Sequence, residues 1–276
     1  MRLQTAFCCL LYMAAITGVA WTQDPTASEA PAKDTTSADF KISTSVYVPH
    51  STTPVSENLT LFQGGLVYDI QFANRKPTEF SIFNSRTNKF VLLDVRKQKR
   101  LELDKIQLLQ YLSGMKQELE ANETMAPLSK TDFQEHYDID KQTLTIDNSI
   151  LTYSAQGERP ADDSVLPRYH DFLENFTMLS ATKPRSFPPF ARIYLNRAIK
   201  KYGFVPTTVS RTIKENAFSR SSGIATSSHR LAMSLTKNDL DWIQLAKKHW
   251  TQFPKVDLSE YLSIEVANNQ GSANKR

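Results

Sequence analysis

Three strand-like runs joined by very short turns constrain the fold of this chain most strongly. In residues 66–73 (LVYDIQFA) a large apolar side chain occupies every second position, and apolar runs follow at 80–83 (FSIF) and 90–95 (FVLLDV). Polar turns at 74–77 (NRKP) and 84–88 (NSRTN) separate these runs. Turns of this length cannot connect parallel neighbours, so the sequence predicts an antiparallel meander.

Four further segments carry apolar residues at the spacing of an amphipathic helix. They cover residues 104–119, 164–179, 188–203 and 236–253. Asp104 is a suitable N-cap for the first, either Thr236 or Asn238 for the last, and Gly203 is placed to end the third. The sequence therefore predicts four helices in these ranges.

Other alternating runs complete the expected sheet. Residues 144–153 predict a second hairpin, and runs near 206–213, 224–235 and 258–266 predict three more strands. The result is about ten strands and four helices, without the regular alternation of strand and helix that builds parallel sheets. We therefore expect an α+β protein with a large antiparallel sheet, a half-barrel being one form of it, and helices packed on one face.

The amino terminus has the pattern of an export signal. Arg2 precedes an apolar run that ends with small residues, Gly18 and Ala20, at positions −3 and −1 of a cleavage site. A retained membrane anchor is the alternative, because the run from Leu3 to Ala20 approaches the length that spans a bilayer. We expect residues 1–20 to be removed, which gives a periplasmic or secreted protein with no transmembrane span.

Composition divides the remaining chain into three parts. Residues 21–39 are expected to be a disordered spacer and 267–276 a disordered tail, because almost no large apolar side chains occur there. No long linker or repeat interrupts residues 40–266, which we expect to form a single α+β domain. Apolar residues make up 40% and charged residues 22% of the 276, as is typical of a globular chain.

Several kinds of chemical site are excluded or unsupported. Both cysteines, Cys8 and Cys9, lie within the predicted signal, so the mature chain has no disulfide, thiolate metal site or cysteine nucleophile. No glycine-rich phosphate loop, HExxH or GxSxG motif occurs. The five histidines are scattered singly: His50, His136, His170, His229 and His249. We expect no cofactor, no metal and no recognisable catalytic residue, while a triad assembled from distant positions stays open.

The distribution of charge is uneven. Residues 164–230 contain eleven Lys or Arg and three Asp or Glu, a net charge of +8. Such a block can attract an anionic partner such as lipid headgroups or another anionic envelope component, whereas export argues against nucleic acid. The alternatives are docking against the acidic half of the chain or a solvated face. The residues predicted to bind the anion are Arg185, Arg192, Arg197, Lys200 and Lys201.

Residues 62–69 (FQGGLVYD) and 90–96 (FVLLDVR) resemble segments of uncharacterised exported bacterial proteins. The expected large antiparallel sheet with helices on one face is also similar to the half-barrel of the LolA and LppX lipoprotein or lipid carriers. That resemblance implies an apolar cavity on the concave face that binds acyl chains. No functional residue is carried over from it, since this chain lacks a motif of that family and has a long helix after the first meander.

These observations favour an exported, non-enzymatic binding or envelope-associated protein that holds an apolar or anionic ligand such as lipid. This hypothesis predicts a cavity lined by Tyr68, Ile70, Phe172 and Phe176. The alternative is an exported hydrolase with a non-local site, which predicts a cleft where a histidine meets a serine or a carboxylate. A purely structural envelope protein would have no cavity. The sequence carries no signal for a particular oligomeric state.

Overall fold

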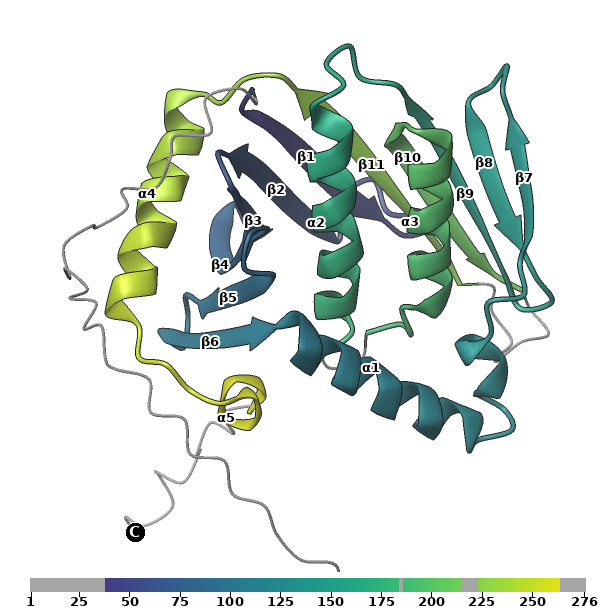
Figure 1. The fold of residues 1–276 in the computed structure, drawn as a ribbon, viewed down its shortest axis with the longest axis horizontal. Coiled ribbons are helices and arrows are strands. Elements are labelled where there is room, and N and C mark those ends of the chain that lie inside the picture. Colours follow the sequence, from purple (N-terminus) through teal and green to yellow (C-terminus); the bar gives the residue numbers. More distant parts are fainter. Residues whose placement is uncertain (1–37, 184–185, 215–222, 264–276) are drawn as a thin grey trace, which may run out of the picture. The chain divides into compact units, whose positions relative to one another are not determined.

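The computed structural model describes residues 38–183, 186–214 and 223–263, which form one large sheet with helices packed against it (Figure 1). The predicted signal peptide, the predicted spacer up to residue 37, Arg185 and the predicted tail lie outside the described residues. The strands are β1 (Phe40–Tyr47), β2 (Ser56–Gln63), β3 (Leu66–Ala73), β4 (Lys76–Asn84), β5 (Lys89–Asp94), β6 (Lys99–Asp104), β7 (Gln134–Asp138), β8 (Thr143–Asp147), β9 (Leu151–Glu158), β10 (Val205–Ile213) and β11 (Ile224–Ala232).

Two antiparallel meanders meet in the middle of this sheet. The strand order is β6-β5-β4-β3-β2-β1-β11-β10-β9-β8-β7, and every neighbouring pair is antiparallel. The first strand, β1, pairs with the last, β11, so that Ile42 lies opposite Leu231. Strands β6 and β7 form the two edges, so the sheet is not closed. The predicted α+β class with a large antiparallel sheet is confirmed.

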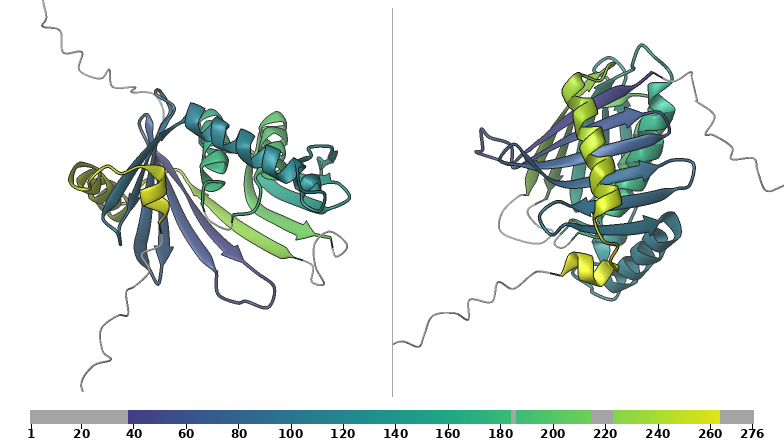
Figure 2. Two further views of the ribbon diagram at one scale, coloured as in Figure 1. Left: turned by 90° about the horizontal axis from the view of Figure 1, so that it is seen from below. Right: turned by 90° about the vertical axis from the view of Figure 1, so that its left-hand side faces the viewer.

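The helices lie on both faces of the sheet. They are α1 (Lys105–Glu120), α2 (Val165–Ser180), α3 (Phe190–Tyr202), α4 (Lys237–Gln252) and α5 (Leu258–Leu262), with a short 3₁₀ helix at Ala126–Ser129. Helices α1, α2 and α3 share one face, as predicted, whereas α4 covers the opposite face of β2 to β5 (Figures 1 and 2).

The position of α4 follows from strands that are apolar on both faces. In β3, Val67 packs on the α2 side, while Tyr68 and Ile70 are buried beneath α4 together with Ile243 and Ala246. The prediction that Tyr68 and Ile70 line a cavity against α2 is wrong. Their side chains point to the other face, because successive residues of a strand alternate between the two faces of the sheet.

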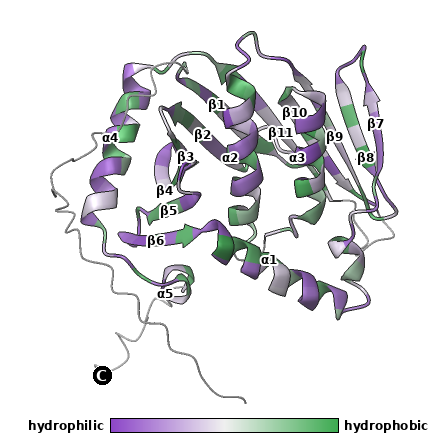
Figure 3. Ribbon diagram, viewed as in Figure 1, coloured by the Kyte–Doolittle hydropathy of each residue, from purple (hydrophilic) through white to green (hydrophobic). Residues whose placement is uncertain are grey.

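Local signals place several helix ends correctly. The Asp104 carboxylate accepts a hydrogen bond from the N–H of Gln107 (2.9 Å), and the Thr236 hydroxyl accepts one from that of Asp239 (3.3 Å), so both are N-caps as predicted. Gly203 ends α3 with a left-handed φ of 70°. Hydrophilic and hydrophobic residues alternate around α2 and α4 in Figure 3, as in helices that pack one side against a sheet.

The predicted strand at 258–266 is wrong over its described part, which forms α5. Asp257 caps this helix by accepting a hydrogen bond from the N–H of Glu260 (2.8 Å). Just before it, the N–H of Val256 donates to the carbonyl oxygen of Arg100 on the edge strand β6 (2.8 Å). The cap and this contact at the sheet edge together outweigh the alternating pattern of apolar residues.

Candidate functional site

A cavity of about 380 Å³ lies between the sheet and the helices on the α2 side. Its floor is formed by residues of β1, β2, β3, β9, β10 and β11, and its roof by α2 and by the connection from α2 to the first turn of α3. A volume of this size is typical of binding sites for small molecules. The interface between sheet and helices is therefore not filled by side chains at this place.

Aromatic side chains form the apolar wall of the cavity. Phe172 and Phe176 are four residues apart on α2, so they lie on the same helix face, and their rings stack at 4.9 Å. Phe62 of β2 meets the Phe172 ring edge-on at 5.6 Å from the sheet side. Both α2 residues of the predicted cavity thus line the observed one.

One end of the cavity carries a buried carboxyl group. Asp69 of β3 is 4% exposed and accepts hydrogen bonds from the Thr60 hydroxyl (2.7 Å) and the Asn58 amide (3.0 Å). Burial raises the pKa of Asp69, although these two hydrogen bonds and the nearby Lys183 act in the opposite direction. The Asp69 carboxyl group therefore holds its proton to higher pH than an exposed aspartate does.

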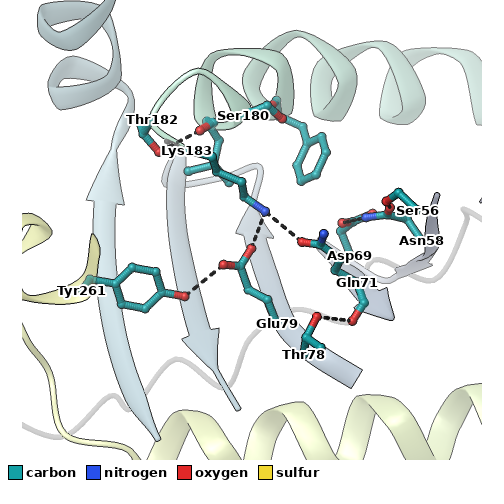
Figure 4. Close-up of polar contacts among 12 residues, drawn as sticks. Ser56, Asn58, Asp69, Gln71, Thr78, Glu79, Ser180, Thr182, Lys183 and Tyr261 are labelled. Atoms are coloured by element: carbon teal, nitrogen blue, oxygen red, sulfur yellow. Dashed lines mark hydrogen bonds and ion pairs between the residues drawn. The ribbon is translucent and has the colours of Figure 1, made fainter. Parts of the chain in front are cut away.

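A polar cluster beside Asp69 connects α2 to the sheet (Figure 4). Lys183, which follows α2, extends its ammonium group to Glu79 (2.6 Å) and to the side-chain oxygen of Gln71 (3.2 Å). The Tyr261 hydroxyl of α5 donates to the other carboxylate oxygen of Glu79 (3.2 Å). The positive charge of Lys183 is thus already paired within the protein.

His229 of β11 lies in the floor of the cavity. Its Nδ1 is 3.0 Å from the Thr44 hydroxyl and its Nε2 is 2.9 Å from the Ser227 hydroxyl. Burial, assisted by the charge of Arg192, lowers the pKa of His229 to about 4, so the ring is neutral at pH 7. His229 and Ser227 are therefore in contact within the cavity, as the hydrolase alternative requires. Among the described residues, however, the group that contacts Nδ1 is the hydroxyl of Thr44 and not a carboxylate.

Two arginines line the cavity without a carboxylate partner among the described residues. The Arg192 Nε donates to the side-chain oxygen of Asn196 (3.1 Å). The Arg211 guanidinium of β10 lies 4.3 Å from the centre of the Phe187 ring, and its buried Nε has no hydrogen-bond partner in the described part of the chain. The polar part of the cavity is therefore positively charged on this side.

The predicted anion-binding residues occupy different surroundings. Arg192 lines the cavity, whereas Lys201 pairs with Glu135 of β7 (2.6 Å) and Arg197 and Lys200 are exposed on α3. Arg185 lies outside the described residues. The anion-binding patch stays a prediction, and only Arg192 of its four described members reaches the cavity.

Asp69, Arg211 and His229 of the cavity were not selected from the sequence as site residues. Asp69 carried a usable signal, since it is an acidic residue between Tyr68 and Ile70 in a mostly apolar strand. Arg211 lies in the basic block 164–230 and His229 is one of the five histidines, but no local pattern places either in the cavity, because their positions there depend on the pairing of β1, β11 and β10. Among the described residues no group of three His, Asp or Glu side chains could hold a metal ion.

Comparisons with known proteins add little. No protein-family model and no curated protein matches the chain. One solved structure, of PNGF-II, matches 77% of this chain at 8% sequence identity and a TM-score of 0.29, and the chain spans 34% of that protein. Similarity at this level carries no argument about fold or function. None of the helices in the described ranges is long and apolar enough to cross a membrane.

Proposed function

We propose that this protein is an exported, non-enzymatic binding protein that holds an amphipathic, lipid-like ligand. The single observation that carries the proposal is the cavity between α2 and the sheet, with its aromatic wall and a few polar groups. Apolar ligand surface placed against Phe62, Phe172 and Phe176 would gain about 25 cal/mol for each Å² removed from water. The signal-like amino terminus supports an exported or envelope-associated location.

Native mass spectrometry of the protein recovered from its own exported compartment tests this function. We expect a reproducible adduct of lipid mass on the wild-type protein. Ser180 lines the cavity from α2, so Ser180→Trp should fill part of it and remove the adduct. Ser113→Trp on the exposed side of α1 is the matched control and should keep it. A bare mass for both the wild type and the control would contradict the proposal.

A hydrolase is the second candidate, and the contact between Ser227 and His229 is the observation that favours it. In this function the neutral imidazole would accept the serine proton as a general base. Its weakness is that, among the described residues, the Thr44 hydroxyl contacts Nδ1 in place of the carboxylate that in a triad orients the ring and stabilises its charged form. Hydrolysis of a p-nitrophenyl acyl ester that disappears in Ser227→Ala, in a protein that keeps its fold, would favour the hydrolase. We expect the wild type and Ser227→Ala to hydrolyse the ester at the same background rate.

A further inference from the structure

We propose that Arg192, Arg211 and the amino-terminal end of α3 form a subsite for an anionic headgroup. The ligand class is then a single-chain amphiphile whose chain lies against the phenylalanines and whose head is an oxyanion, a carboxylate or a phosphate. This inference rests on the proposed binding function and specifies its ligand.

The positive charges of the two arginines are unbalanced among the described residues. Two other basic residues near this face have acidic partners: Lys183 pairs with Glu79 and Lys201 with Glu135. Arg192 and Arg211 have none in the described part of the chain, although both line a largely apolar cavity. A charge in such surroundings is costly unless a counter-charge is supplied, and a ligand oxyanion would supply it.

The amino-terminal end of α3 lies at the same place. Pro188 and Pro189 border the cavity, and the N-cap residue, Pro189, makes no side-chain capping bond. The first N–H of the helix bonded to the chain is that of Ile193, which donates to the Pro189 carbonyl oxygen (2.8 Å). Among the described residues, no acceptor contacts the preceding N–H groups of the first turn, which lie at the positive end of a helix that has no acidic residue there.

The opposite end of the cavity gives the ligand a direction. Asp69 lies on β3 and Arg211 on β10, four inter-strand spacings or roughly 19 Å apart along the sheet. The Glu79 carboxylate near this end, and Asp69 when it is ionised, repel an anion, whereas the arginines attract one. The headgroup belongs at the end formed by α3 and β10, and the acyl chain extends beneath α2 toward β3.

Binding of three twelve-carbon probes tests the subsite by isothermal titration calorimetry. Dodecanoate and dodecyl phosphate carry an oxyanion head, whereas dodecanol is neutral. Wild-type protein freed of ligand should bind at least one anion about tenfold more tightly than dodecanol. The binding free energy of one charge-assisted hydrogen bond corresponds to a change in Kd of about this size. Arg192→Gln and Arg211→Gln should each reduce this preference severalfold, because they weaken binding of the anion more than binding of dodecanol.

Control variants separate the possible outcomes. Arg230→Gln changes an exposed arginine on β11, next to His229 and therefore on the other face, and should leave the preference intact. If a Gln variant unfolds, Arg192→Lys and Arg211→Lys retain the charge and should retain part of the preference. Equal binding of all three probes would overturn the subsite while leaving the cavity function standing. Failure of all three probes to bind would instead overturn the proposed function.

Discussion

Asp239, at the start of α4, accepts hydrogen bonds that connect two distant parts of the chain. One oxygen of its carboxylate accepts from the N–H (2.7 Å) and the hydroxyl (2.8 Å) of Thr236 and from the ammonium of Lys41 on β1 (2.6 Å). Burial alone would raise the pKa of Asp239, but the bonds from Lys41 and Thr236 outweigh it and lower the pKa. This carboxylate therefore both caps α4 and holds the helix to the sheet.

Replacing Asp239 should destabilise the fold strongly. We expect Asp239→Ala to lower the free energy of unfolding by about 2–4 kcal/mol at pH 7, because a cap and a buried ion-pair partner are both lost. Since the folded pKa is depressed, this contribution is present above the unfolded pKa and is lost as the pH falls through the folded pKa. Asp241→Ala, which breaks an exposed pair with Lys237 on the same helix, should cost less than about 1 kcal/mol. Urea denaturation measures both, and equal losses would contradict this role of Asp239.

His170 on α2 should make stability depend on pH. It is 6% exposed, and neither ring nitrogen has a hydrogen-bond partner among the described residues. Burial, with a smaller effect of Lys200, lowers the pKa of His170 to about 4. The unfolded chain therefore binds more protons than the folded one between pH 6.5 and 4, and stability falls as the pH is lowered through that range.

Comparison of unfolding at pH 7 and pH 5 tests this effect. The loss of stability between these two pH values should be about 2 kcal/mol smaller in His170→Phe than in the wild type. The packing cost of the larger phenylalanine ring is the same at both pH values, so it cancels in the change of stability between them. The exposed His136 of β7 provides the control, since His136→Phe should preserve the wild-type difference. If His170→Phe loses as much stability between pH 7 and pH 5 as the wild type does, the buried ring does not titrate as expected.

Among the elements, the antiparallel neighbours β9 and β10 have a very close backbone approach. The register of the two strands shifts between Pro206 and Thr208. Opposite this irregularity, a Cβ added to Gly157 would clash with the carbonyl oxygen of Val205 and lie 2.8 Å from the Cα of Pro206. Glycine is required here by the close approach of the two backbones.

Two glycine substitutions should have opposite effects. Gly157→Ala should reduce the free energy of unfolding by about 1–3 kcal/mol or more, because the backbone of β10 has to move. Gly114→Ala, within α1 and with no atom near the added Cβ, should increase it by about 0.5–1 kcal/mol. Thermal and urea denaturation measure whether each substitution lowers or raises the free energy of unfolding. A neutral Gly157→Ala would mean that β10 moves aside without cost.

For the whole molecule, ligand binding and global stability are linked. A ligand that occupies the cavity between α2 and the sheet binds only the folded state, because the cavity walls come from many elements. At 100 times its Kd such a ligand adds about 2.7 kcal/mol of stability. We expect dodecanoate at this excess to raise the Tm by about 5–10 °C. Differential scanning calorimetry measures the shift, which should be smaller for Arg211→Gln at the same dodecanoate concentration. No shift in the wild type would contradict binding in the cavity.

The sequence by itself determined the local features of this protein. The meander over 66–95, the caps at Asp104, Thr236 and Gly203, and the α+β class follow from turn lengths, side-chain periodicity and caps. Each of these signals depends on residues only a few positions apart. That is why they could be interpreted without knowledge of the rest of the chain.

Only the tertiary structure decided which face of each strand meets which helix, and with it the site. Alternation in β3 defined two faces, but the choice of Tyr68 for the core beneath α4 and of Asp69 for the cavity depends on where α2 and α4 pack. The pairing of β1 with β11 joins residues 179 to 191 positions apart and brings Thr44 to His229. Such pairings are selected by the burial of the whole core, a property that no local run of residues contains.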